Sequence, residues 1–210
     1  MKTKWAGLLV AGTVIVFSGC ATMSGDECVT SDWRGIGFED GARGYTASRL
    51  SQHRKACAKH GVTPDLQAYQ DGRSDGLREY CQPQRGFNLG VSGGQYNGVC
   101  SIEQEGSFLG AYRRGAQLHS LRANVNSTNY QIGVKEHEVD DVAVAIRNAE
   151  AGLIATETTV QNRILLLADL KELAERTGRL EAEILALRED RVAYEHQLAS
   201  FEAVLADTGY

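Results

Sequence analysis

The sequence has 210 residues, with 22 basic and 27 acidic side chains and a formal net charge of −5. An acidic balance argues against nucleic acid as a partner, because phosphate binding requires clustered Lys and Arg. The acidic excess lies in the second half, since residues 20–101 hold 9 basic and 9 acidic side chains and residues 102–210 hold 11 and 18.

Residues 1–19 are predicted to be a signal peptide, because Lys2 and Lys4 precede an apolar run that is too short to span a bilayer. Residues 17–20, Phe-Ser-Gly-Cys, resemble the lipobox of bacterial lipoproteins, although Phe17 stands where Leu is usual. The resemblance implies lipid on Cys20. Ala21 implies sorting to the outer membrane of a Gram-negative envelope, on its periplasmic side. The alternative is a plain secretory signal with an incidental Cys.

Four further cysteines, Cys28, Cys57, Cys81 and Cys100, follow the lipid-bearing one. An even number in an exported chain predicts disulfides, and four thiols allow three pairings. A ring of the size closed by Cys81 and Cys100 stabilises a fold by about 3 kcal/mol in the chain-entropy model. We therefore favour Cys81–Cys100, which leaves Cys28–Cys57 by elimination.

Residues 20–123 are predicted to form a small, mainly α-helical domain held by these disulfides. An aromatic residue is followed by Gly three or four residues on, and often by a second Gly four further, as in Trp33-Gly37-Gly41. Glycines four apart lie on one helix face and let another backbone approach closely. This pattern favours short packed helices around residues 31–43, 46–60, 65–79 and 104–122, with Asp65 as an N-cap.

Residues 82–99 are predicted to form a Gly-rich loop closed by Cys81–Cys100. Residues 90–94 match Gly-x-Ser-x-Gly, but the flanks lack the strand and helix that a nucleophile elbow requires. The loop also lacks the Gly-Lys-Ser/Thr ending of a phosphate-binding loop. If the loop segment 86–98 and its neighbours bound a ligand, Arg85, Tyr96 and Asn97 would be the contacts.

His53, Cys57 and His60 lie on one helical face, a spacing that would suit Zn²⁺ if a fourth ligand joined them. The competing interpretation is that Cys57 is oxidised and the histidines are solvated. We favour the second interpretation and expect no metal and no cofactor.

Residues 124–135 are predicted to be a polar linker and residues 136–207 a long coiled-coil helix. Apolar residues recur there at alternating steps of three and four, which is the coiled-coil pattern. We favour one continuous helix, with a hairpin folded near residues 177–178 as the alternative. A long helix must bury such a seam against a second copy, its own first half or another protein. The coil seam comprises Leu173, Leu180, Ile184, Leu187, Tyr194, Leu198 and Phe201.

Four short motifs stand out within residues 20–122. They are residues 32–41 with Asp-Trp, Ile-Gly and Asp-Gly pairs, residues 69–81 ending in Tyr-Cys, residues 95–100 and residues 108–115. Together they resemble a family of bacterial lipoproteins of unknown function, the domain-of-unknown-function family twenty-seven ninety-nine. The resemblance implies an exported, lipid-anchored protein and supplies no activity.

These observations favour a non-enzymatic lipoprotein of the outer membrane, which uses an acidic coiled coil to associate with itself or with another envelope protein. The alternative is a periplasmic binding module or enzyme acting on a cell-wall component or small ligand through residues 86–98. The two hypotheses differ in the surface that they require: the coil seam for the first and the Gly-rich loop for the second.

Overall fold

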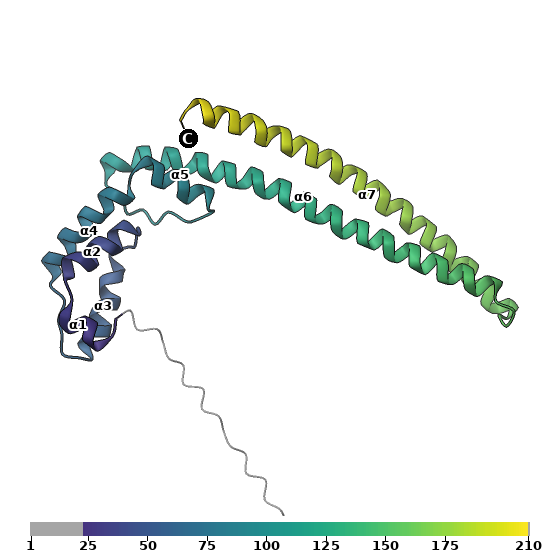
Figure 1. The fold of residues 1–210 in the computed structure, drawn as a ribbon, viewed down its shortest axis with the longest axis horizontal. Helices are drawn as coiled ribbons and strands as arrows, with labels where there is room; N and C mark the ends of the chain where they lie inside the picture. Colours follow the sequence, from purple (N-terminus) through teal and green to yellow (C-terminus); the bar gives the residue numbers. More distant parts are fainter. Residues whose placement is uncertain (1–22, 210) are drawn as a thin grey trace, which may run out of the picture. The chain divides into compact units, whose positions relative to one another are not determined.

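The computed structural model describes residues 23–209, which form seven α-helices and no strand (Figure 1). The predicted class, a mainly α-helical protein with a disulfide-held N-terminal part, is confirmed. Two long helices follow this part, where a single long helix was predicted. The predicted signal peptide and Cys20 lie outside the described residues. The helices are α1 (Gly25–Thr30), α2 (Trp33–Ala42), α3 (Ser48–Ala58), α4 (Leu66–Tyr80), α5 (Pro83–Val91), α6 (Ile102–Ile154) and α7 (Val160–Asp207).

The described residues divide into two compact units, which meet between residues 76 and 77. The division falls inside α4, well before residue 123, where the sequence analysis placed the end of the small domain. The first unit holds the disulfide Cys28–Cys57 and the second holds Cys81–Cys100, the two pairs favoured from the sequence.

Polar side chains begin the helices of the first unit. Ser24 and Glu27 form a reciprocal capping box at α1, and the Asp32 side chain accepts from the backbone N–H of Arg34 at the start of α2. Asp65 accepts from the backbone N–H of Ala68 at 3.0 Å, so the predicted N-cap of α4 is confirmed. Such caps satisfy backbone donors that the first helical turn leaves without partners.

The first unit is built around two helices, α2 and α4, whose backbones touch at glycines. A Cβ added to Gly37 would lie 2.1 Å from the carbonyl oxygen of Tyr69, and one added to Gly72 would lie 1.9 Å from that of Arg34. No side chain fits at either position, which is why the sequence accepts glycine inside a helix despite its cost of about 1 kcal/mol. The core beside this contact consists of Met23, Cys28, Trp33, Ala56, Cys57 and Tyr69.

The second unit repeats this contact between α5 and α6. Added Cβ atoms at Gly90 and Gly115 would lie 2.2 Å from the Tyr112 carbonyl oxygen and 2.1 Å from the Phe87 carbonyl oxygen. The expectation of a loop over residues 82–99 is therefore wrong for its first half, where Gly86 and Gly90 are buried helix residues that face α6. The chain turns only afterwards, at Gly93 and Gly98, whose φ angles are 71° and 66°.

The predicted linker, residues 124–135, is a continuous part of α6. Its polar character conceals a helical pattern, because Thr128 and Ile132 are each 5% exposed and lie on the buried side of α6. The expectation of a linker is wrong because the segment is helical and is covered along this face. It has no Pro and only one Gly to interrupt the helix.

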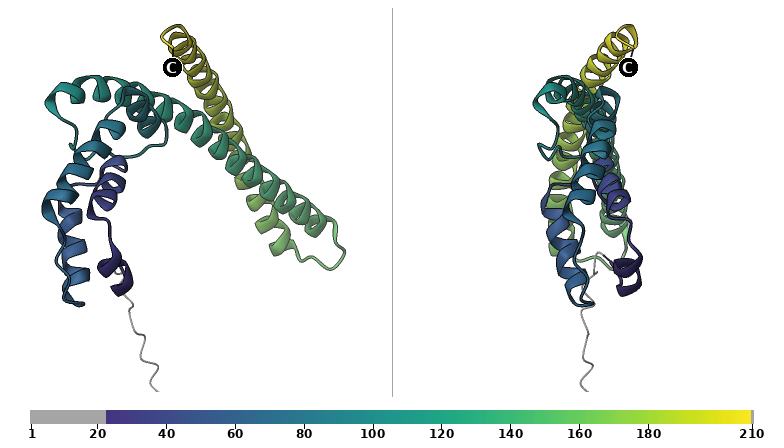
Figure 2. Two further views of the ribbon diagram at one scale, coloured as in Figure 1. Left: turned by 60° about the vertical axis from the view of Figure 1, so that its left-hand side comes forward. Right: turned by 90° about the vertical axis from the view of Figure 1, so that its left-hand side faces the viewer.

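The predicted continuous helix over residues 136–207 is also corrected, since the chain turns back at residues 155–159. Figures 1 and 2 show α7 returning along α6, so the two helices form an antiparallel hairpin. Thr158 donates to the Gly152 carbonyl at 2.7 Å, and Thr159 accepts from the backbone N–H of Asn162 as the N-cap of α7. Each of these two side chains hydrogen-bonds a backbone group that a turn between helices leaves without a partner.

Two glycines of α6 give a matched test of the close contact. We expect Gly115→Ala to lower the free energy of unfolding by about 1–3 kcal/mol, because the methyl group must push α5 away. Gly110→Ala has open space around the added carbon and should be neutral or stabilising by up to about 1 kcal/mol. Urea unfolding followed by circular dichroism measures both, and equal effects of the two substitutions would contradict the contact.

Candidate functional site

The coil seam is covered by α6 of the same chain. Leu180 and Ile184 are 4% and 7% exposed, and the seam positions around them are half-buried. On α6, Ile132, Val142 and Ala149 are buried along the facing side. The predicted seam is therefore correct in its spacing, and its partner is α6 of the same chain, most of which precedes the predicted coil. The half-buried seam positions are Leu173, Leu187, Tyr194, Leu198 and Phe201.

Ion pairs between the two helices lie along both sides of the seam. Arg188 contacts Glu136 at 2.7 Å, and Lys135 contacts Glu183 at 3.0 Å. Near the other end of the hairpin, Arg122 contacts Glu202 at 2.7 Å. Pairs this exposed contribute little energy, but opposite charges beside a coiled-coil seam fix the register and orientation of the helices.

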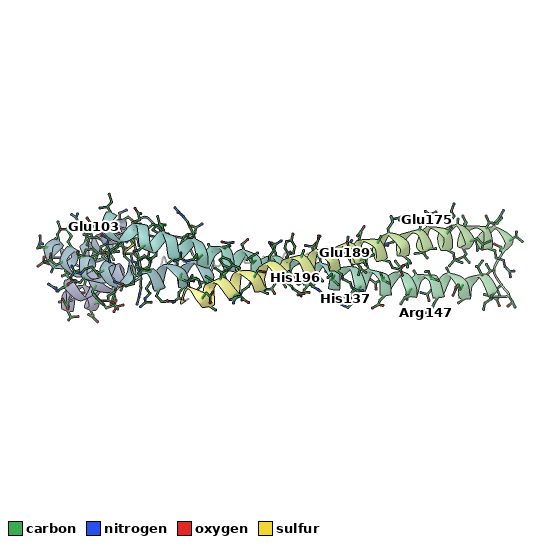
Figure 3. The ribbon with its side chains drawn as sticks, turned by 90° about the horizontal axis from the view of Figure 1, so that it is seen from above. Glu103, His137, Arg147, Glu175, Glu189 and His196 are labelled. Carbon is green, nitrogen blue, oxygen red and sulfur yellow. A yellow bond between two sulfur atoms is a disulfide. The ribbon has the colours of Figure 1, made fainter. Side chains whose placement is uncertain are left out.

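The end of the hairpin is apolar on its outer surface. We call residues 151–170 the hairpin tip. It carries five large aliphatic side chains that are 58% to 83% exposed. Most of the outward positions along the rest of the hairpin are polar or charged. Examples are His137 and Arg147 of α6 and Glu175 and Glu189 of α7 (Figure 3). Exposed apolar clusters are common at interaction sites, so the hairpin tip is a candidate surface. The five residues are Ile154, Val160, Ile164, Leu165 and Leu167.

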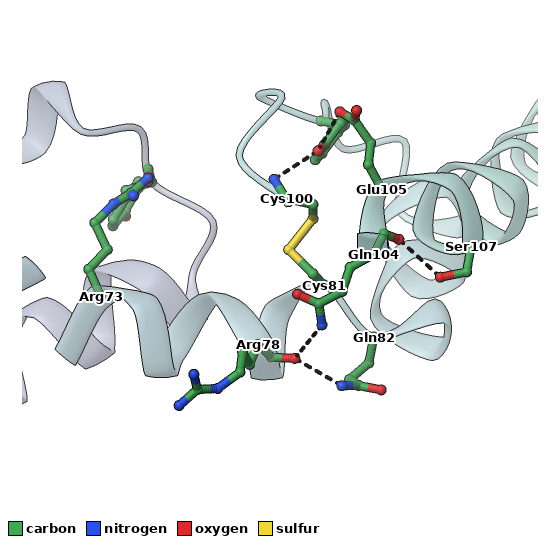
Figure 4. The surroundings of a disulfide bond; sticks show 10 residues. Arg73, Arg78, Cys81, Gln82, Cys100, Gln104, Glu105 and Ser107 are labelled. Carbon is green, nitrogen blue, oxygen red and sulfur yellow. Dashed lines mark hydrogen bonds between the residues drawn. A yellow bond between two sulfur atoms is a disulfide. The ribbon is translucent and has the colours of Figure 1, made fainter. Parts of the chain in front are cut away.

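The residues proposed as loop contacts are not gathered into a site. The Tyr96 hydroxyl accepts from the backbone N–H of Cys100 and donates to Glu105, both at 2.9 Å, and its ring lies 4.9 Å from that of Phe108. Figure 4 shows Glu105 and the Cys81–Cys100 disulfide. Burial raises the pKa of Tyr96. Arg85 is an exposed side chain of α5 and Asn97 is an exposed residue of the turn. Tyr96 therefore holds the disulfide-closed turn to α6.

A buried polar cluster in the first unit was not identified as a set from the sequence. Asp40, His53 and Tyr69 are 5%, 3% and 1% exposed. Asp40 Oδ2 accepts from the Tyr69 hydroxyl at 2.9 Å and lies 2.8 Å from His53 Nε2, and Arg49 Nε lies 3.7 Å from Asp40 Oδ1. Burial, and then the hydrogen bond to Asp40, raise the pKa of Tyr69 far above its ordinary value. The phenol therefore stays protonated and donates to the carboxylate.

A cleft of about 530 Å³ opens beside this cluster. Met23 and Ile36 supply apolar lining, while Arg43, Arg49 and His53 supply nitrogen donors. Its volume lies within the range of small-molecule sites.

The sequence analysis also considered His53, Cys57 and His60 as metal ligands. Cys57 is bonded to Cys28, so its sulfur is not available as a thiolate. Between residues 23 and 209, no group of three or more His, Cys, Asp or Glu side chains is arranged to hold a metal ion. Over the same residues, no helix is both long enough and apolar enough to cross a membrane.

Residues 32–117 match the model of the family described as "Protein of unknown function (DUF2799)", so this part of the chain carries that family's domain. The match includes Asp40, His53 and Tyr69 and ends within α6, before most of the hairpin. No curated protein and no solved structure matches the chain.

Buried tyrosines predict a loss of stability at alkaline pH. The folded-state pKa values of Tyr69, Tyr80 and Tyr96 are raised, so their contribution is complete below the unfolded tyrosine pKa of about 10 and is lost as pH rises above it. Above that pH the unfolded chain loses protons that the folded chain keeps. The free energy of unfolding then falls by up to about 1.4 kcal/mol per pH unit for each such group.

The free energy of unfolding measured from pH 8 to 11 should therefore fall most steeply in the wild type and less steeply in Tyr69→Phe. Tyr130→Phe, at a ring that is 74% exposed, is the control and should keep the wild-type slope. An unchanged slope in Tyr69→Phe would mean that its hydroxyl is not buried in the folded protein.

Proposed function

We propose that this chain is a non-enzymatic envelope lipoprotein, held at the outer membrane by lipid on Cys20, whose hairpin associates with a second copy through its tip. The exposed aliphatic cluster of the hairpin tip is the observation that carries the proposal. Export is supported by the signal-like residues 1–19 and by two disulfides, which persist in oxidising compartments.

The seam itself is an unsuitable surface for association. Leu180 and Ile184 would have to leave α6 before they reached another protein, and exposing one such side chain costs about 1.5–3 kcal/mol. The hairpin tip requires no opening, since its aliphatic side chains already face solvent. Association through the tip therefore replaces association through the seam as the simpler mechanism.

A second copy fits the tip in shape. Val160, Ile164 and Leu167 follow at steps of four and three, so they form one stripe along α7. Two such stripes can pack antiparallel around a two-fold axis near Ile164, with Val160 of each copy against Leu167 of the other. A self-complementary patch of this kind is what a symmetric dimer requires.

The charges around the stripe fit the same arrangement. Glu157 lies in the turn that precedes the stripe, and Lys171 lies on α7 after it. Antiparallel pairing brings Glu157 of one copy toward Lys171 of the other, which favours this orientation over a parallel one.

A lipid surface fits the tip less well. Residues 151–170 contain no aromatic side chain and a single basic one, Arg163, which donates to the Ala155 carbonyl at 3.2 Å. Helices that lie in a membrane interface carry Lys or Arg on the polar face and aromatic residues at the boundary.

Five aliphatic side chains cover less than the roughly 800 Å² per partner of a stable interface, so pairing in dilute solution should be weak. Lipid anchors change this, because two chains held on one membrane meet at a high effective concentration. The proposal therefore requires the anchor and the tip together.

Cysteine substitution in cells tests both parts. Ile164→Cys should give a disulfide-linked dimer on a non-reducing gel, because the residue sits beside the two-fold axis. Glu189→Cys, an exposed position elsewhere on α7, should stay monomeric. Adding Cys20→Ser should reduce the Ile164→Cys dimer several-fold and abolish labelling of the protein by an alkyne-modified palmitate.

Comparable dimer yields at both positions would show random collision, and absence of the Ile164→Cys dimer would exclude a second copy as the occupant of the tip. Palmitate labelling that persists in Cys20→Ser would contradict the lipid anchor independently of the tip.

A further inference from the structure

The buried cluster of the first unit leaves two nitrogen atoms without a hydrogen bond. Asp40 is the shared acceptor for Tyr69 and His53. Arg49 Nε and His53 Nδ1 are both buried, and neither has a hydrogen-bond partner among the described residues. An arginine Nε can only donate, and the nearest carboxylate oxygen, Asp40 Oδ1, lies 3.7 Å from it, which is too far for a hydrogen bond. A buried donor without a hydrogen bond is costly, so an acceptor placed at Arg49 would be favourable.

The other acidic groups of the cleft are already engaged. Glu39 pairs with Arg43 at 3.3 Å, Glu27 accepts from the backbone N–H of Ser24 at 2.7 Å, and Asp32 caps α2. A molecule that enters the cleft could supply an acceptor that these side chains do not.

Arg49 is held in place for such a contact. Its Nη1 donates to Gln52 at 2.8 Å, and its guanidinium lies 4.8 Å from the centre of the Tyr45 ring. Its side chain is 28% exposed, so it connects the buried cluster with the open part of the cleft. A guanidinium fixed in this way is suited to bind a carboxylate through two parallel hydrogen bonds.

We propose that this cleft binds a small carboxylic acid. The carboxylate lies at Arg49 and His53, and a short apolar part lies against Met23 and Ile36. A monoanion is favoured over a phosphate dianion, because four acidic side chains, Glu27, Asp32, Glu39 and Asp40, line the same cleft. This inference is independent of lipid anchoring and of pairing through the hairpin tip.

Nuclear magnetic resonance of the full chain carrying Cys20→Ser tests this site, with butyrate as the probe. Butyrate should cause saturable shifts of the Arg49 Nε–H signal and of the His53 ring signals. Butyramide, which has the same shape without the charge, should cause none. Inorganic phosphate should bind more weakly than butyrate.

A pair of arginine variants on α3 provides the control. Arg49→Gln should weaken butyrate binding by about tenfold or more, because it removes a charged donor from the site. Arg54→Gln, at an exposed position outside the cleft lining, should leave binding unchanged. If Arg49→Gln fails to fold, the comparison of butyrate with butyramide on the native side chains still decides the question.

Three outcomes would each overturn the proposal and leave an enclosed water as the acceptor. They are absence of a saturable shift, equal shifts with butyramide, and unchanged affinity in a folded Arg49→Gln. Tighter binding of phosphate than of butyrate would overturn the assignment to carboxylates.

Discussion

Burial of the α7 seam against α6 is the contact on which the second unit depends. Each fully buried leucine or isoleucine contributes about 1.5–3 kcal/mol, whereas an exposed ion pair contributes at most about 1 kcal/mol. Leu180 and Ile184 therefore supply the energy of the hairpin, while Arg188–Glu136 and Lys135–Glu183 set its register. Without this contact both helices would expose an apolar face, and neither would persist alone over such a length.

The same contact decides which surfaces remain for function. A seam closed within one chain cannot also recruit a partner, so association moves to the hairpin tip, where Val160, Ile164 and Leu167 have no cover among the described residues. At its other end α6 packs on α5 through Gly115, so one long helix connects the disulfide-held turn to the tip. The hairpin thus continues from the Cys81–Cys100 region within the second unit.

Several features could be predicted from the sequence because they depend on local spacing. The spacing of apolar residues at three and four positions predicted the coil seam. Glycines four apart indicated a close helix contact, which lies at Gly37 and Gly72. The Cys81–Cys100 pair followed from loop size.

Other features depend on tertiary contacts that spacing does not encode. The turn at residues 155–159 contains neither Gly nor Pro, so nothing local marked it, and α5 resembled a loop because its glycines are stabilised only by packing against α6. Asp40 lies 13 residues from His53 and 29 from Tyr69, and only the folded first unit brings these three together. The sequence signal was Asp40 itself, a charged residue between Gly37 and Gly41. This spacing does not indicate that His53 and Tyr69 are its partners.

The central claim, that the seam is closed within one chain, is tested most directly by carbodiimide cross-linking of a mixture of unlabelled and ¹⁵N-labelled protein. Lys135 Nζ lies 3.0 Å from the Glu183 carboxylate and should form an amide with it. The account predicts that mass spectrometry will find this cross-linked peptide pair only in the fully unlabelled and fully labelled forms. Mixed-isotope pairs in comparable amounts would show that α6 and α7 of different chains pack together, and would contradict the hairpin.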